Sequence, residues 1–164
     1  MVHRISIILC LLVSMATAQS INKEYASYLA TLDLTDEVAR LAPEELDDST
    51  DWLFLDTRPE KEFDVGHLPG AKRIGYMPRQ PYVLEGLEKN QPIVVYCTVG
   101  WRSGQIGAWL QSLGFTKVYN LNGGILAWAN AEKPIENAAG QMTNRVHVYN
   151  EDFSKWLKKG EPVY

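Results

Sequence analysis

One cysteine and one arginine stand close together in a stretch whose residue types suit nucleophilic chemistry. Cys97 follows the apolar run Ile93–Tyr96, and Arg102 follows the short segment 98–101, which contains Gly100. This order predicts a buried strand, a tight turn and the start of a helix. The amides of such a turn and of a helix N-terminus favour a negative charge and lower the pKa of a thiol. We therefore expect Cys97 to be partly thiolate, which is the nucleophilic form.

The neighbours of Cys97 have separate expected roles. Arg102 supplies a permanent charge and a fork of donors for an anionic substrate, or it pairs with a nearby acid at the helix start. Gly100 lets the backbone turn inward at little steric cost. Trp101 either lines the mouth of the site or caps the core. The residues expected to bind substrate are Thr98, Val99, Gly100, Trp101, Arg102 and Ser103.

Short apolar runs alternate with helical patterns along the middle of the chain. The runs at 52–55, 93–96 and 117–119 lack strict alternation of apolar and polar residues, which suits strands buried on both faces. The segments 102–113 and 124–130 carry apolar residues at helical spacing. The alternation predicts an α/β fold with a central, mostly parallel sheet flanked by helices on both faces.

The first two predicted strands end in polar residues. Asp56 ends the first run and Cys97 follows the second, so both belong to the carboxyl edge of the sheet, where α/β proteins bind ligands. Asp56 and Arg58 are therefore candidate supporting residues of the site. An ion pair between Arg58 and Glu62, four positions apart on a helical turn, is the structural alternative.

The first eighteen residues have the pattern of a secretory signal peptide. A basic start precedes the apolar run 5–13, and small residues stand at Ala16 and Ala18, which predicts cleavage before Gln19. The run is too short to span a bilayer. A buried N-terminal helix or a retained anchor is the alternative. We expect an exported protein, periplasmic or extracellular, with no stable membrane anchor after cleavage.

Cysteine usage and charge narrow the function classes. Cys10 lies in the apolar run and leaves with the signal peptide, so Cys97 is unpaired, and an unpaired thiol in an exported protein is a reactive group or an intermolecular linker. An inert buried cysteine is the alternative.

The net charge of −4 becomes −5 on removal of Arg4, and no basic stripe is present, which argues against nucleic acid as a partner. His67 and His147 with one cysteine make no metal site, and we expect no cofactor.

Two extensions flank the strand and helix alternation. In the tail, we expect 134–136 and 145–149 to pair as a β-hairpin, with His147 on the strand surface, followed by a short amphipathic helix at 151–159. The resulting division is a signal peptide at 1–18, an N-terminal helical extension at 19–37, a central domain at 38–134 and a hairpin and helix appendix at 135–164.

Four motifs stand in order in the central part of the chain. They are Leu55-Asp56-Thr57-Arg58-Pro59-Glu60 with Glu62-Phe63, Gly66-His67-Leu68-Pro69-Gly70-Ala71, Cys97 with Arg102-Ser103, and Asn122-Gly123-Gly124 through Trp128. Together they resemble the signature segments of the rhodanese family of sulfurtransferases, over about residues 41–134. The resemblance implies a rhodanese-like fold and identifies the cysteine loop as an active-site loop.

The resemblance also implies a mechanism and partners. Cys97 would attack the outer sulfur of a small anionic donor such as thiosulfate and become a persulfide, from which cyanide or a thiol removes the sulfur. A protein thiol is a further acceptor of this kind. Loop amides would stabilise the charge on sulfur.

Two other functions use similar features. Phosphatases also place a cysteine and an arginine around an anion loop, but theirs resembles a cysteine, five residues and an arginine, whereas four residues separate Cys97 from Arg102. A binding or sulfur-relay module would keep the cysteine and pass one sulfur only to a protein partner. Turnover with small acceptors separates a relay from an enzyme.

Overall fold

The structure is a computed structural model that describes residues 21–32, 37–47 and 49–164. Its elements confirm the predicted α/β class. The helices are α1 (Lys23–Thr31), α2 (Glu60–Val65), α3 (Trp101–Ser112) and α4 (Gly124–Asn130), with 3₁₀ turns at Pro43–Glu45, Pro81–Leu84 and Glu151–Trp156. The strands are β1 (Arg40–Leu41), β2 (Leu53–Asp56), β3 (Lys72–Arg73), β4 (Ile93–Tyr96), β5 (Val118–Leu121), β6 (Arg145–His147) and β7 (Glu161–Val163).

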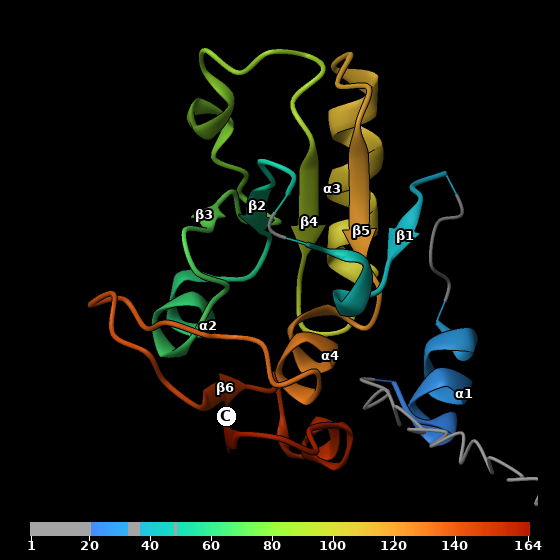
Figure 1. Cartoon of the computed structure of the whole chain (residues 1–164), viewed down its shortest axis with the longest axis vertical. Coiled ribbons are helices and arrows are strands. Elements are labelled where there is room, and N and C mark those ends of the chain that lie inside the picture. The colour runs from blue at the N-terminus through green and yellow to red at the C-terminus, as the bar shows by residue number, and fades with distance from the viewer. Residues whose placement is uncertain (1–20, 33–36, 48) are drawn as a thin grey trace, which may run out of the picture.

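Five parallel strands form the central sheet in the spatial order β1-β5-β4-β2-β3 (Figure 1). The predicted strands at 52–55, 93–96 and 117–119 correspond to β2, β4 and β5. Asp56 of β2 lies opposite Tyr96 of β4, so the two polar strand ends meet at one edge, as expected. β1 and β3 have two residues each, too few to leave a periodic pattern in the sequence.

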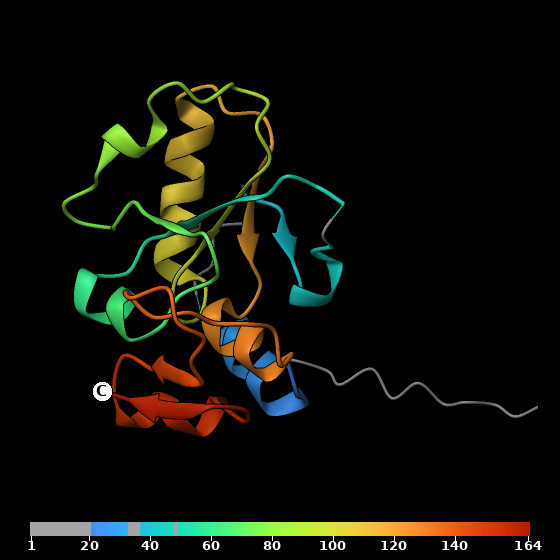
Figure 2. The same cartoon turned by 60° about the vertical axis from the view of Figure 1, so that its left-hand side comes forward.

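Helices cover both faces of the sheet (Figures 1 and 2). Val95 of β4 packs in one cluster with Ile106 of α3, while its neighbour Val94 packs in another with Ile125 of α4 and Leu29 of α1. Side chains of a strand point to alternate faces, so two apolar neighbours require cover on both sides. The continuous apolar run of β4 is explained by this arrangement.

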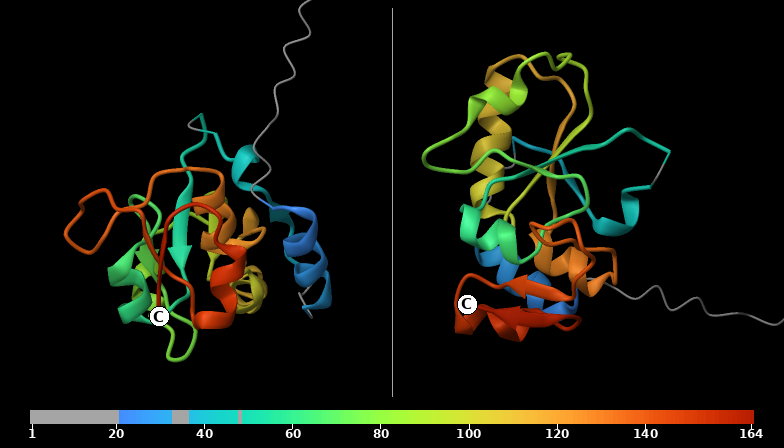
Figure 3. Two further views of the ribbon diagram at one scale, coloured as in Figure 1. Left: turned by 90° about the horizontal axis from the view of Figure 1, so that it is seen from below. Right: turned by 90° about the vertical axis from the view of Figure 1, so that its left-hand side faces the viewer.

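The two chain extensions meet beyond the carboxyl ends of the strands. Helix α1, helix α4 and the C-terminal segment lie side by side there (Figures 1 and 3). The ring of Trp156 stacks on Tyr25 and Tyr28, with ring centroids 5.4 and 5.1 Å apart. The hydroxyl of Tyr25 donates to the Gly123 carbonyl at 2.7 Å. Aromatic packing thus joins both extensions to the domain.

The predicted hairpin in the tail is wrong. Glu136 exchanges backbone hydrogen bonds with His67, at 2.8 and 3.0 Å, and its bridge to Met142 is isolated. β6 instead pairs in parallel with β7 at the end of the chain. Glu136 is thus occupied by a residue far away in sequence, and the Ile135 carbonyl accepts from the Thr143 N–H at 2.9 Å, so neither pairs with 145–149.

Two smaller expectations for the tail are also corrected. His147 is buried, with 4% of its surface exposed, because β6 packs against α2 and α4. The segment expected as a helix at 151–159 is a 3₁₀ turn over Glu151–Trp156, begun by the Asn150 side chain, which accepts from the Phe153 N–H.

The predicted signal peptide, with Cys10 and the cleavage position before Gln19, lies outside the described residues. Within the described ranges, none of the helices has the length and apolarity needed to cross a membrane.

Candidate active site

Cys97 lies in a tight loop between the end of β4 and the first turn of α3. Its side chain is buried, with 1% of the residue surface exposed. The Gly100 N–H donates a hydrogen bond to the Cys97 Sγ at 3.1 Å. Gly100 has a φ of 108°, a left-handed conformation that side chains disfavour. The loop therefore has the predicted strand, turn and helix order, and it directs an amide at the sulfur.

The start of α4 holds the loop from one side. The Ile125 N–H donates to the Cys97 carbonyl at 2.9 Å, and the Leu126 N–H donates to the Thr98 carbonyl at 3.4 Å. Gly124 has a φ of 56°, and a Cβ atom there would overlap both carbonyl groups. Only glycine lets α4 approach so closely. The glycine-rich motif that begins α4 thus fixes the peptide orientation of the cysteine loop.

Asn120 of β5 holds the loop from the other side. Its Nδ2 donates to the Gly100 carbonyl at 2.9 Å, and its Oδ1 accepts from the Ser103 hydroxyl at 2.8 Å. Both Asn120 and Ser103 are buried. Ser103, expected to bind substrate, therefore supports the loop and does not line the cavity above the sulfur.

The surroundings of Cys97 stabilise its thiolate. Burial raises the pKa of the thiol, but the Arg102 charge and hydrogen bonds from the Ser103 and Gly100 amides together lower that pKa below its usual value. A thiol with a lowered pKa is more fully ionised near neutral pH, and the thiolate is the nucleophile. The geometry therefore supports the activated cysteine that the sequence predicts, with no histidine base.

Arg102 is bound by a buried acid. Its guanidinium donates to the Glu62 carboxylate at 3.1 and 3.2 Å and to the Thr98 hydroxyl at 2.9 Å. Glu62 lies in α2 and is 2% exposed. The Tyr149 ring covers the guanidinium, with its centroid 5.5 Å from Cζ. Arg102 thus combines both expected alternatives, since it stands at the site and is paired with an acid.

Asp56 and Arg58 form a separate buried pair at the end of β2. Arg58 Nη2 donates to Asp56 Oδ2 at 2.6 Å and to the Gly66 carbonyl at 2.7 Å. Both side chains have no exposed surface. The Arg58–Glu62 ion pair, the structural alternative, is not formed, because Arg58 pairs with Asp56 and Glu62 pairs with Arg102. The pair ties the first motif to the second, and it supports the turn beside the site.

A cavity of about 240 Å³ lies directly above Cys97. Its wall combines the cysteine loop with the end of α1 and with the C-terminal segment. Trp101 is 40% exposed and lines this cavity, so it lies at the mouth and does not cap the core. The lining residues are Tyr28, Leu32, Cys97, Thr98, Val99, Trp101, Arg102, Tyr149 and Phe153.

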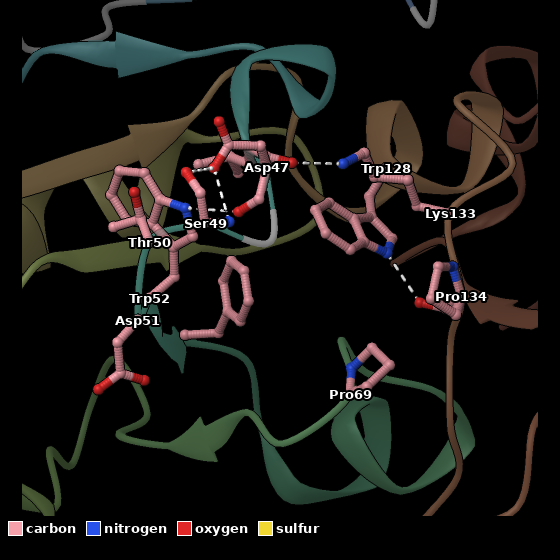
Figure 4. A pocket seen from close by; sticks show the side chains of 11 residues that line it. Asp47, Ser49, Thr50, Asp51, Trp52, Pro69, Trp128, Lys133 and Pro134 are labelled. Atoms are coloured by element: carbon pink, nitrogen blue, oxygen red, sulfur yellow. Dashed lines mark hydrogen bonds between the residues drawn. The ribbon is translucent and has the colours of Figure 1, made fainter.

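A larger cavity, of about 700 Å³, lies away from Cys97, between the start of β2 and the end of α4 (Figure 4). Its polar groups are largely bonded among themselves. Trp128 Nε1 donates to the Pro134 carbonyl at 2.8 Å, and Lys133 Nζ donates to the Leu46 carbonyl at 2.7 Å. Cys97 does not line it. The larger cavity is therefore not the candidate active site, because it lacks the nucleophile.

His67 and His147, the histidines that the structure describes, are held by other contacts. His67 stacks on Phe63, with ring centroids 3.7 Å apart, and its Nδ1 lies 2.8 Å from the Phe63 carbonyl. The Nδ1 of His147 accepts from the Tyr149 N–H at 3.1 Å. Among the residues that the structure describes, no three histidine, cysteine or acidic side chains gather as they would around a metal ion.

Sequence reasoning missed several residues that shape the site. Glu62 lies within the first motif, and its spacing from Arg58 suggested the wrong partner. Asn120 is a polar residue inside an apolar strand, which is a usable signal for a buried hydrogen-bond role. The aromatic residues Tyr28, Tyr149 and Phe153 come from the extensions, and only tertiary packing brings them to Cys97.

Comparison with known proteins agrees with this geometry. A profile of the rhodanese-like domain matches residues 39–131. Curated relatives include tRNA uridine(34) hydroxylase from Escherichia coli, which is 37% identical over 87 residues; the match covers 50% of this chain and 25% of that protein. The chain therefore spans about a quarter of the length of these relatives.

Solved structures show the same fold. A rhodanese-like domain protein from Staphylococcus aureus superposes with a TM-score of 0.50 at 27% identity, covering 56% of this chain and 91% of that one. A Bacillus halodurans protein superposes with a TM-score of 0.56 at 21% identity, covering 82% of this chain and 97% of that one. With the profile covering more than half of its length, the chain belongs to the rhodanese-like domain family.

Proposed function

We propose that the chain is an exported, single-domain sulfurtransferase that carries a sulfane sulfur as a persulfide on Cys97. The donor is a small sulfur-containing anion such as thiosulfate, and the acceptor is cyanide or a thiol, including a protein thiol. The proposal requires no cofactor, and the acidic net charge of −4 offers no attraction for nucleic acid. The hydroxylation of tRNA named for the Escherichia coli relatives is not carried over to this chain.

One observation carries the proposal. The Cys97 Sγ lies beneath a cavity and accepts a hydrogen bond from the Gly100 amide at 3.1 Å, in a loop that α4 and Asn120 hold in place. A persulfide adds one sulfur atom to this position, directed at the cavity. Preorganised donors stabilise negative charge on sulfur without rearranging during the reaction.

The chemistry balances in two steps. The Cys97 thiolate attacks the outer sulfur of thiosulfate, so a bond forms between the two sulfurs while the bond to the sulfonate group breaks and sulfite leaves with the electron pair. An acceptor nucleophile then attacks the outer sulfur of the persulfide. The bond to Cys97 breaks, and the cysteine leaves as a thiolate, ready for another cycle.

Turnover with small molecules tests the proposal. Purified protein is incubated with thiosulfate and cyanide, and thiocyanate is measured against time and against Cys97→Ser. We expect many thiocyanate molecules per protein and none above background for the variant. Activity retained by Cys97→Ser would contradict the mechanism. One sulfur taken up and never released to a small acceptor would instead indicate a relay that serves a protein partner.

A phosphatase is the less supported alternative. Phosphatase loops resemble a cysteine, five residues and an arginine, whereas four residues separate Cys97 from Arg102. We expect no hydrolysis of p-nitrophenyl phosphate above the Cys97→Ser background.

Export is part of the proposal and needs its own test. The basic, apolar and small-residue order of the first eighteen residues supports a cleaved signal peptide. Expression of the full chain in a secreting host should yield a mature form that begins at Gln19, identified by N-terminal sequencing. A protein retained in the cytoplasm with its first eighteen residues intact would contradict this expectation.

A further inference from the structure

The outer wall of the cavity above Cys97 comes from the two chain extensions. Tyr28 belongs to α1, and Tyr149 and Phe153 belong to the C-terminal segment. We call these three residues the aromatic rim. All three lie outside residues 39–131, which match the family profile. The rim is therefore an addition to the domain that carries the cysteine loop.

The aromatic rim is a packed structure. The Phe153 ring meets Tyr28 and Tyr149 edge to face, with ring centroids 5.9 and 5.5 Å apart. Trp156 stacks on Tyr28 from behind, at 5.1 Å. Edge-to-face and offset-stacked pairs hold aromatic rings in defined orientations. The cavity thus has a preformed apolar wall opposite the sulfur.

Among the residues that the structure describes, Arg102 is the one cationic side chain that lines this cavity. Arg102 is paired with the buried Glu62 carboxylate, and Tyr149 covers its guanidinium. For the acceptor, a charged body would lose its hydration here and gain little from a guanidinium that is already paired. An apolar body would instead release water from the aromatic rim and from Val99, which is favourable.

The cavity has room for one ring and a short arm. Its volume is about 240 Å³. A cavity of about 150 Å³ lined by apolar side chains already accommodates benzene. The remaining space admits a methylene group and a sulfur atom between the ring and Cys97.

We infer that the acceptor that discharges the Cys97 persulfide is a low-molecular-weight thiol with an apolar, aromatic-sized body that occupies the cavity against the aromatic rim. This inference rests on the proposed function and names the acceptor class. The acceptor thiolate, its proton lost to solvent, attacks the outer sulfur. A sulfur–sulfur bond forms to the acceptor, the bond to Cys97 breaks, and the acceptor leaves as a persulfide.

The test compares two acceptors of similar thiol acidity. The Cys97 persulfide is first formed with thiosulfate and verified by intact mass. It is then discharged with phenylmethanethiol or with 2-hydroxyethanethiol, and each rate constant is divided by that for the same thiol with a small-molecule persulfide. We expect the normalised rate constant for phenylmethanethiol to exceed that for 2-hydroxyethanethiol by about tenfold or more. This is the range of discrimination that a hydrophobic pocket provides.

Rim variants show whether the wall causes the preference. Phe153→Ala and Tyr149→Ala should each lower the ratio several-fold, because they remove wall surface that the ring contacts. Tyr82→Ala is the matched control, since Tyr82 is 63% exposed, comparable to the 55% of Tyr149, and does not line the cavity. Its ratio should equal that of the unaltered protein.

The outcomes separate the inference from the proposed function. Equal normalised rates for the two thiols, or a ratio unchanged in both rim variants, would overturn the inference while persulfide formation leaves the sulfurtransferase intact. Failure to form a persulfide at all, seen before any acceptor is added, would overturn both.

Discussion

The floor and the rim of the cavity above Cys97 are built in different ways. The floor is the cysteine loop, fixed by buried backbone hydrogen bonds from α4 and by the Asn120 side chain. The aromatic rim is fixed by ring packing between the two extensions, and Tyr149 in it is 55% exposed. The floor controls the state of the sulfur, whereas the rim controls what approaches it.

This difference separates reactivity from selectivity. Changes in the floor should alter the pKa of the Cys97 thiol and the rate with every substrate, because the loop amides and Arg102 act on the sulfur itself. Changes in the rim should alter the choice among acceptors. Variants of the floor and of the rim should therefore differ in what they change.

Removal of the nucleophile has the largest effect. Cys97→Ser should reduce sulfur transfer to the level without protein, since a serine hydroxyl does not form the persulfide. Because the site is buried, we expect a loss of about 1 kcal/mol in the free energy of unfolding, measured by urea denaturation. A folded variant that still produces thiocyanate would show that another group carries the sulfur.

Gly124→Ala should break the floor. The new Cβ overlaps the Cys97 and Thr98 carbonyls, so the loop must shift, and a displacement of about 1 Å can cost roughly 100-fold in rate. Gly86→Ala is the matched control, because Gly86 has a φ of 75° and nothing within 4 Å of its Cβ position. The control variant is destabilised only by the left-handed backbone conformation of its new alanine, by about 1–2 kcal/mol. Equal loss of activity in both variants would mean that the contact with the loop is unimportant.

Arg102→Gln should raise the pKa of the Cys97 thiol, because the positive charge that lowers it is lost. A higher pKa reduces the thiolate fraction at pH 7, so alkylation by iodoacetamide at that pH should slow about tenfold and the profile should move to higher pH. Arg102→Lys keeps the charge and should move the profile less. An identical profile for all three proteins would remove Arg102 from the activation of the thiol.

Trp156→Ala should loosen the rim and leave the floor unchanged. Trp156 stacks on Tyr25 and Tyr28 but does not line the cavity. We expect a loss of about 2 kcal/mol in stability and a smaller preference for phenylmethanethiol. The pH profile of Cys97 alkylation should not move, and a shift of that profile would show that floor and rim are coupled.

The same division explains what the sequence could predict. β4 and the turn after it are local features, because a fully apolar run, Gly100 and a helical pattern adjoin one another, and the structure confirms their order. The pairing of Arg102 with Glu62 joins residues 40 positions apart, and no periodicity indicates it. The contact of Gly124 with the loop is likewise tertiary, although the motif itself was visible.

The tail shows the limit most clearly. The hairpin expected between 134–136 and 145–149 needs a turn between them, and Gly140 has a φ of 70°, but β6 pairs with β7 at the end of the described chain. Strand pairing depends on which unpaired edges meet in space, which local residue types do not specify. The aromatic rim follows from this pairing, so it was not predictable from the sequence.

The most direct measurement of the central claim is the intact mass of the purified protein after incubation with thiosulfate. The account predicts a gain of about 32 Da, the mass of one sulfur atom, which disappears on addition of cyanide and is absent from Cys97→Ser. A folded protein with a free thiol and no added mass would contradict the account, because the activated Cys97 would then not accept sulfur from this donor.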